Sequence, residues 1–327
     1  MNFLFESLKF SEFEIFSELI HAVSPRCFEN DEGEIEEFSF QGNDETGKAK
    51  EHVKHFLESI KIEINNLYLV NQVHGDKVFI LDDLNLTFSE VAKISADAVI
   101  TQLPEKPIGV FTADCLPILV YDPRLKVIGV IHAGRKGTEE NIIFKVIREM
   151  TRVYGSRPEE LIAGFGPAIG ECCYEVGEDC IRPFKDLFPD EKSLFRFDLS
   201  GSYFLDLIAV NKLEGQKAGL LPENIFSMRH CTFCSTKNLY SYRREGKTGR
   251  ILRVLSSTNR LVVAGINMRT KHMKKSQQSP GRKVSYEASL NASNVMLLKP
   301  KTKKGSRQGS RFDRAGKKER FAKNSGE

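Results

Sequence analysis

The sequence PIGVFTADCLPILVYDPRLKVIGVIHAGRKGT, residues 107–138, contains two apolar runs on either side of Asp122-Pro123-Arg124. The runs span residues 108–121 and 126–133. Proline presets φ for the second position of a turn, and apolar runs that flank such a turn are typical of a β-hairpin. We therefore expect a strand pair at the centre of the molecule.

Each apolar run carries a soft metal ligand near its end, Cys115 in TADCLP and His132 in VIHAG. A third run, residues 67–73, leads into NQVHG and supplies His74. The close ligand pairs of a structural zinc site are absent from this set, so the site would be assembled by tertiary structure. Three protein ligands leave one position for water, which bound zinc acidifies toward neutral pH. We predict that His74, Cys115 and His132 hold a zinc ion.

Three residues are candidates for catalysis: Cys115, Asp114 and Cys172. Cys172 and its neighbour Cys173 are candidates for the general acid, as is Asp114. In an extended strand Asp114 points away from the adjacent Cys115, which favours a structural role for it. The identity of the general acid therefore stays open at this stage.

Three further residues are candidates for substrate binding: Gln72, Lys136 and Arg243. In an extended strand Gln72 shares a face with His74, because side chains alternate with a period of two. Lys136 and Arg243 are cations at turns beside apolar runs, and a phosphate or a carboxylate is the expected ligand of at least one of them.

The seven cysteines are scattered without the spacing of a disulfide scaffold, which favours a reducing cytoplasm. Cys231 and Cys234 form one CxxC, and Cys172-Cys173 occurs elsewhere. A single CxxC without a partner pair is a weak signal, so incidental or structural cysteines are favoured over a second metal site. No apolar run reaches the ~18 residues of a membrane span, and the acidic N-terminus does not have the pattern of a secretory signal.

The charge is unevenly distributed along the chain. Residues 269–327 contain 17 Lys and Arg against 4 Asp and Glu, whereas the remainder contains 31 against 40. The basic segment has few apolar residues, which predicts disorder. Its alternative role is salt-sensitive contact with nucleic-acid phosphates. We expect a catalytic body over residues 1–260 and a disordered basic tail over residues 269–327.

Hydrophobic periodicity predicts the main elements of the body. Helices are expected over residues 47–60, 138–155 and 206–218, with Thr138 as an N-cap and Gly155 as the end of the second helix. Strands are expected over residues 19–23, 161–165 and 224–228, and residues 95–101 are expected to be a loop that enters another short strand. The segment LYLVNQVHGDKVFIL predicts a strand, a turn at Gly75-Asp76 and a second strand.

Six motifs occur in one order: NQVHG, ADAVIT, TADCLPILVYDP, IHAG, GPAIGECCYEVG and YSYRREGKTGR. This series, over about residues 19–250, resembles the bacterial purine nucleoside phosphorylases of the laccase-domain family, earlier described as multicopper polyphenol oxidases. The resemblance implies a single α/β domain, with mixed β-sheet layers flanked by helices and zinc held by His74, Cys115 and His132. It also implies phosphorolysis of adenosine, inosine and S-methyl-5′-thioadenosine, and hydrolytic deamination of adenosine.

One motif departs from the family pattern. The family usually has His-Ala-Gly-Trp-Arg-Gly, whereas this chain has His132-Ala133-Gly134-Arg135-Lys136-Gly137 and contains no tryptophan. Lysine keeps the charge of arginine but not its planar fork of donors. We expect zinc binding to survive this change, whereas substrate affinity depends on it.

Three other functions compete with this one. The first is a copper-dependent polyphenol oxidase, although one set of two histidines and a cysteine is too small for a multicopper centre. The second is a hydrolase that edits peptidoglycan precursors, a role proposed for some relatives. The third is a non-enzymatic nucleic-acid-binding protein that acts through its tail.

Overall fold

The computed structural model describes residues 7–29, 35–38, 48–62, 67–198, 201–235, 238–245, 249–273, 282–292, 295, 297–298, 305–306, 308–312 and 318–322. The chain forms two compact units, Met1–Glu245 and Gly246–Glu327. Each unit is described separately below.

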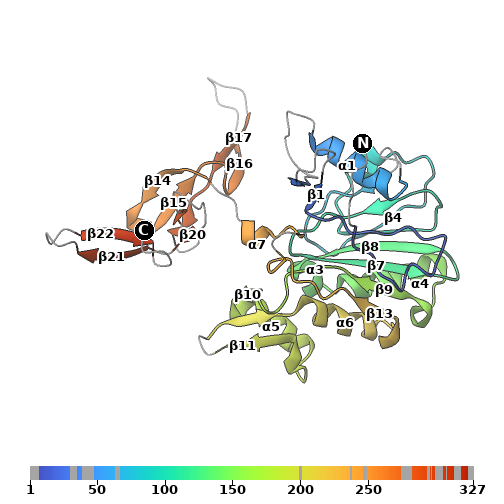
Figure 1. The fold of residues 1–327 in the computed structure, drawn as a ribbon. Helices are drawn as coiled ribbons and strands as arrows, with labels where there is room; N and C mark the ends of the chain where they lie inside the picture. Colours follow the sequence, from blue (N-terminus) through green and yellow to red (C-terminus); the bar gives the residue numbers. More distant parts are fainter. Residues whose placement is uncertain are drawn as a thin grey trace. The chain divides into compact units, whose positions relative to one another are not determined.

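The expected hairpin lies at the centre of the first unit (Figure 1). Strands β7 (Leu116–Asp122) and β8 (Val127–Ala133) pair antiparallel from Leu116↔Ala133 to Asp122↔Val127. Asp122 fixes the turn, because its Oδ1 accepts hydrogen bonds from the backbone N–H groups of Arg124 and Leu125, both at 2.9 Å. The first apolar run is divided, however: β6 (Ile108–Gly109) belongs to another sheet, and residues 110–115 form no strand.

The hairpin is the middle of a six-stranded mixed sheet with the order β13-β9-β7-β8-β5-β4. Its other strands are β4 (Val78–Ile80), β5 (Ala98–Thr101), β9 (Ile162–Phe165) and β13 (Ile225–Ser227). The β4–β5 and β9–β13 pairs are parallel, and the other pairs are antiparallel. These bounds confirm the strands predicted over residues 161–165 and 224–228, and the short strand expected after the loop in residues 95–101.

Alternation along the strands sends side chains to two cores. Ala98 and Ile100 of β5 join the larger core, which includes the apolar side of helix α4 (Ile142–Tyr154). Val99 lies between them in sequence and packs instead in a second core with Val130, its direct partner on β8. The sheet is therefore buried on both faces, and its edges and strand ends are where polar side chains can be reached.

The helix predicted from residue 138 is two helices. α3 (Arg135–Glu139) begins directly after β8 with Gly134 as its N-cap, and Asn141, with φ of 59°, separates it from α4. Thr138 is thus wrong as an N-cap: it is buried within α3, and its Oγ1 accepts a hydrogen bond from Asn211 Nδ2 at 2.9 Å. Gly155 ends α4 with φ of 74°, as predicted.

The other two predicted helices are confirmed as α1 (Lys48–Ser59) and α6 (Leu207–Lys217). Asp206 caps α6 by accepting a hydrogen bond from the backbone N–H of Ala209 at 2.9 Å. The remaining elements of this unit are β1 (Cys27–Glu29), β2 (Ile35–Glu37), β3 (Tyr68–Leu69), α2 (Phe88–Val91), β10 (Glu175–Val176), α5 (Glu178–Leu187), β11 (Phe195–Phe197), β12 (Tyr203–Leu205) and α7 (Tyr242–Glu245).

The strands predicted on either side of Gly75-Asp76 are confirmed as β3 and β4, and residues 74–75 form a bend between them. The two strands do not pair with each other, because β3 pairs with β6 and β4 pairs with β5 in a different sheet. The segment between them crosses from one sheet to the other. The strand predicted over residues 19–23 is wrong: only an isolated bridge joins Val23 to Leu8.

The second unit consists of paired strands. β14 (Ile251–Leu255), β15 (Arg260–Val263) and β18 (Leu290–Asn291) form one sheet. Three separate two-stranded hairpins are the other described sheets of the unit. These hairpins join β16 (Met268–Met273) to β17 (Arg282–Glu287), β19 (Leu297–Leu298) to β20 (Gly305–Ser306), and β21 (Gln308–Phe312) to β22 (Lys318–Ala322). The strands within residues 269–327 belong to the described part of a segment for which disorder is expected, and that expectation stays a prediction. The second unit begins at Gly246. The end of the catalytic body at residue 260 also stays a prediction.

Among the described residues, no helix combines the length and the apolar character needed to cross a membrane.

Candidate active site

The structure brings together His74, Cys115 and His132, one ligand atom of each lying within 4.8 Å of the other two. The hairpin explains two of them, because Cys115 directly precedes β7 and His132 is the penultimate residue of β8. His74 reaches the same place from the crossing segment between β3 and β4. The two imidazole rings are nearly perpendicular, at 86°, with centroids 4.7 Å apart.

Asp97, which directly precedes β5, holds both histidines in place. Its side chain is fully buried, and its Oδ1 lies 2.8 Å from His132 Nδ1. The same carboxylate accepts the backbone N–H groups of His74 at 2.9 Å, Gly75 at 2.7 Å and Val73 at 3.2 Å. Because an ionised carboxylate only accepts, the proton of neutral His132 lies on Nδ1, and Nε2 is left with a lone pair for a metal.

The hydrogen bonds at Asp97 also decide its charge. Burial by itself would raise the pKa of Asp97, but the bonds from His132, Gly75 and Val73 outweigh it and hold that pKa below its ordinary value. Asp97 is therefore a buried anion at neutral pH. It provides negative charge directly behind the three candidate ligands, where a divalent cation would be stabilised.

Close backbone packing supports the crossing segment. His74 has a φ of 59°, so it leaves the extended conformation, and the expectation that it shares a strand face with Gln72 is wrong. A Cβ on Gly137 would lie 2.6 Å from the carbonyl oxygen of Gly75, so α3 touches this turn. A Cβ on Gly134 would lie 3.1 Å from Cys115 Sγ. Glycines after His132 thus leave room for the segment that carries His74.

The donor set fits zinc. Burial lowers the pKa of His74, and the nearby His132 lowers it further, so the imidazole is neutral and has a lone pair to donate. Burial raises the pKa of Cys115 to about 11, with the charges of Asp114 and Asp97 acting in the same direction. A bound cation would offset this effect and release the thiol proton. Two imidazoles and one thiolate form a ligand set typical of catalytic zinc, with a fourth position for a reactant.

Asp114 does not follow the alternation of a strand. Its φ is 86°, and its carboxylate accepts hydrogen bonds from Thr232 Oγ1 and from the backbone N–H of Arg243, both at 2.6 Å. Asp114, which directly precedes the candidate ligand Cys115, is therefore hydrogen-bonded to the loop that carries Thr232 and to helix α7. Its proposed role as general acid stays a prediction.

The profile of the family described as multi-copper polyphenol oxidoreductase laccase matches residues 21–258, which include all of these residues. The chain belongs to this family. A purine nucleoside phosphorylase of Bacteroides thetaiotaomicron is 28% identical to it over 253 residues, which cover 75% of this chain and 94% of that protein. Adenosine deaminase RL5, from an unknown prokaryotic organism, is 33% identical over 190 residues, covering 57% of this chain and 72% of that protein.

The same fold occurs in the crystal structure of YlmD from Geobacillus stearothermophilus, with a TM-score of 0.63 and 22% identity. The match covers 70% of this chain and 88% of that one. The second unit has a different relative: residues 266–327 match the profile of the C-terminal domain of large ribosomal subunit protein uL24. A laccase-family domain is thus followed by a segment that resembles part of a ribosomal protein.

The predicted substrate-binding residues of the laccase-family domain lie in different settings. Gln72 is braced by the backbone of Phe111, donating to its carbonyl at 2.9 Å and accepting its N–H at 2.8 Å. Lys136 has a side chain that is 62% exposed and lies 3.8 Å from Glu140. The guanidinium of Arg243 donates to the carbonyl of Glu175 at 3.0 Å. For each of these three residues, a role in substrate binding stays a prediction.

Tyr174 lies beside Arg243. The guanidinium carbon of Arg243 lies 5.4 Å from the Tyr174 ring centroid. Burial raises the pKa of Tyr174; the thiol of Cys115 acts in the same direction, whereas the charges of Arg135 and Arg243 oppose it. The Arg243 guanidinium and the Tyr174 ring are therefore close enough for a cation–π contact.

Cys172 does not join the group formed by His74, Cys115 and His132. It lies in a separate cluster with Cys173, Cys231 and Cys234. Sequence reasoning missed Asp97 and Tyr174. Asp97 left one signal, an acidic residue between two alanines at the start of an apolar strand, where an unpaired charge would be costly.

Proposed function

We propose that this protein is a zinc-dependent purine nucleoside phosphorylase, a glycosyltransferase, that also deaminates adenosine. The observation that carries the proposal is the convergence of two histidines and a cysteine on one point, backed by a buried carboxylate. Relatives named purine nucleoside phosphorylase and adenosine deaminase support the reaction class. The proposed substrates are adenosine, inosine and S-methyl-5′-thioadenosine.

His74, Cys115 and His132 would hold the zinc ion. The ion would supply Lewis-acid stabilisation of negative charge and would lower the pKa of a water ligand toward neutrality. Asp97 keeps the Nε2 lone pair of His132 directed outward and holds the backbone of His74. These two tasks require the buried carboxylate to stay ionised, which its hydrogen bonds achieve.

In phosphorolysis a phosphate oxygen forms a bond to the ribose C1′, while the bond from C1′ to the purine nitrogen breaks. The anionic phosphate must be held beside the sugar, and arginine forks fit its oxygens in bidentate fashion. Arg135 and Arg243 are the proposed phosphate ligands, because Arg135 begins α3 three residues after His132 and the backbone N–H of Arg243 is bound by Asp114, which precedes Cys115. Lys136 is a third candidate, whose ammonium carries the charge but not the planar fork of donors.

In deamination the oxygen of water adds to C6 of adenine, and the amino group leaves as ammonia. The departing nitrogen needs a proton, and Asp114 is the proposed group that transfers it. Its two hydrogen-bond donors, Thr232 and the Arg243 backbone, hold the carboxylate in a fixed position. This fixed position supports the assignment.

Chromatography of the products from adenosine and phosphate tests the proposal. Adenine with ribose-1-phosphate indicates phosphorolysis, and inosine indicates deamination. We expect Cys115→Ala to abolish both. Absence of both products from zinc-loaded protein would refute the proposal. Copper in stoichiometric amount, with oxygen uptake that depends on a phenol, would instead favour a polyphenol oxidase.

The second unit supports a separate candidate function, contact with RNA. Residues 266–327 match a ribosomal protein domain, and residues 269–327 are strongly basic. We propose that this unit binds RNA through phosphate contacts. The affinity of the full chain for ribosomal RNA should fall steeply with salt, because bound counterions are released. His74→Ala should leave that affinity unchanged, and failure to bind RNA at low salt would refute this function.

A further inference from the structure

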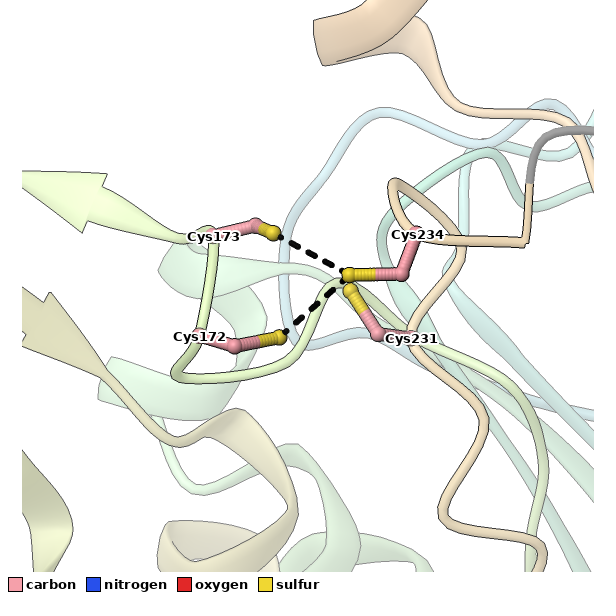
Figure 2. A group of neighbouring side chains, drawn as sticks. All are labelled: Cys172, Cys173, Cys231 and Cys234. Carbon is pink, nitrogen blue, oxygen red and sulfur yellow. Dashed lines mark hydrogen bonds between the residues drawn. The ribbon is translucent and has the colours of Figure 1, made fainter.

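Four of the seven cysteines form one cluster, although they come from two distant loops. Cys172 and Cys173 lie in the turn that precedes β10, and Cys231 and Cys234 lie in the loop after β13 (Figure 2). Their sulfur atoms all lie within 4.8 Å of one another. Figure 2 shows the four side chains directed toward a common point.

The spacing of the sulfur atoms is that of a tetrahedral metal site. With zinc–sulfur bonds of about 2.3 Å, tetrahedral geometry separates the sulfur atoms by about 3.8 Å. Cys234 Sγ lies 3.7 Å from Cys172 Sγ and 3.4 Å from Cys173 Sγ. A disulfide requires about 2.05 Å, and all four residues are free cysteines. The two sulfur–sulfur distances therefore match a shared ion and not a covalent bond.

The surrounding backbone holds the two loops together. The N–H of Gly170 donates to Cys231 Sγ at 3.3 Å, a contact that favours the thiolate form of a metal ligand. Cys173 donates its N–H to the carbonyl of Gly170 at 2.9 Å, which closes the first turn. The second loop is joined to the first by an isolated parallel bridge between Ala168 and Cys231. The cluster is thus fixed by backbone contacts on both sides.

We propose that Cys172, Cys173, Cys231 and Cys234 bind a structural zinc ion. Four thiolates complete the tetrahedral shell, so the site has no open position and no reaction of its own. Partly exposed thiols in a tight group would otherwise be prone to oxidation. This site is separate from the one formed by His74, Cys115 and His132, and it does not rest on the proposed enzymatic function.

The ion would also steady the candidate active site. Thr232 lies between Cys231 and Cys234, and its hydroxyl donates to Asp114 Oδ1 at 2.6 Å. Phe233, in the same loop, accepts a hydrogen bond from the Arg244 guanidinium at 2.9 Å. Asp114 directly precedes Cys115, so the four-cysteine site would position Asp114 through Thr232. The cysteines are positioning residues in this scheme.

Zinc content of the full chain, purified in the presence of reductant, tests the proposal. We expect two zinc ions per chain in the wild-type protein and one in Cys234→Ser. The double variant His74→Ala/His132→Ala should also hold one. When that double variant is loaded with cobalt, it should show the charge-transfer absorption of four thiolates. Cys180→Ser, which changes a cysteine outside both groups, should retain both ions.

Two results would overturn the proposal. One is a zinc content in Cys234→Ser equal to that of the wild type. The other is a wild-type protein whose zinc is lost completely in His74→Ala/His132→Ala. If Cys234→Ser does not fold, titration of His74→Ala/His132→Ala with a mercurial thiol reagent gives the answer: release of one zinc ion supports the site, and release of none contradicts it.

Discussion

Replacing Asp97 by asparagine should weaken zinc binding at the candidate active site. Oδ1 of Asp97 accepts from His132 Nδ1 and from the N–H of His74, and Oδ2 accepts from the N–H groups of Gly75 and Val73. Asparagine has only one side-chain oxygen, so its NH2 group replaces either Oδ1 or Oδ2 and faces hydrogen-bond donors in both orientations. If the NH2 group replaces Oδ2, it lies against the backbone N–H groups of Gly75 and Val73. With the amide at Oδ1 the proton of His132 is driven to Nε2, the atom needed for zinc.

The magnitude follows from these contacts. Loss of a partner that orients a metal ligand typically costs 10- to 100-fold in metal affinity. This corresponds to about 1.4–2.7 kcal/mol of binding free energy. The metal-free protein should also unfold more easily, because hydrogen bonds to a charged group contribute ~1.5–3 kcal/mol each and the variant loses at least one.

Competition with a chromogenic chelator would measure the zinc affinity of the folded variant. Asp122→Asn is the matched control: Asp122 is fully buried too, but its Oδ1 accepts from the hairpin turn and its Oδ2 has no hydrogen-bond partner in the described part of the chain. We expect wild-type zinc affinity in the control. Equal affinities in Asp97→Asn and the wild type, with both proteins folded, would refute the role assigned to Asp97.

Arg135→Ala should raise KM for phosphate about 10- to 100-fold in steady-state kinetics, the loss expected for a charge-assisted hydrogen bond, whereas Lys136→Ala should change KM little. A larger rise of KM in Lys136→Ala than in Arg135→Ala would show that the exposed lysine binds phosphate instead. Glu214→Gln should flatten the pH dependence of thermal stability. Burial raises the pKa of Glu214 from 4.5 to about 8, so the folded state holds the extra proton between these values and stability falls as pH rises across them, by at most ~5 kcal/mol; an unchanged slope in Glu214→Gln would contradict this. Gly137→Ala should lower zinc affinity, because the new Cβ would lie 2.6 Å from the Gly75 carbonyl oxygen and displace the turn beside His74. Wild-type zinc affinity of Gly137→Ala in the chelator titration would contradict this.

The sequence alone determined the scaffold of the candidate site. The Asp-Pro turn between two apolar runs predicted the β7–β8 hairpin, and that hairpin carries two of the three candidate ligands at its open end. Strong periodicity predicted α1 and α6, and Gly155 predicted the end of α4. These are local features, because turn geometry, capping and burial of an apolar stripe depend on residues close in sequence.

Tertiary structure decided which residues meet around that hairpin. Positive φ at His74 and Asp114 redirected both side chains, and strand alternation could not anticipate this. The partners of His132 and Asp114, namely Asp97 and Thr232, lie 35 and 118 positions away along the chain. The four cysteines likewise gave only the weak signal of a single CxxC in the sequence, yet packing of two loops placed their sulfur atoms together. Local sequence sets the conformation of a segment, but contacts between distant segments arise only when buried apolar faces pack and bring their flanking polar residues together.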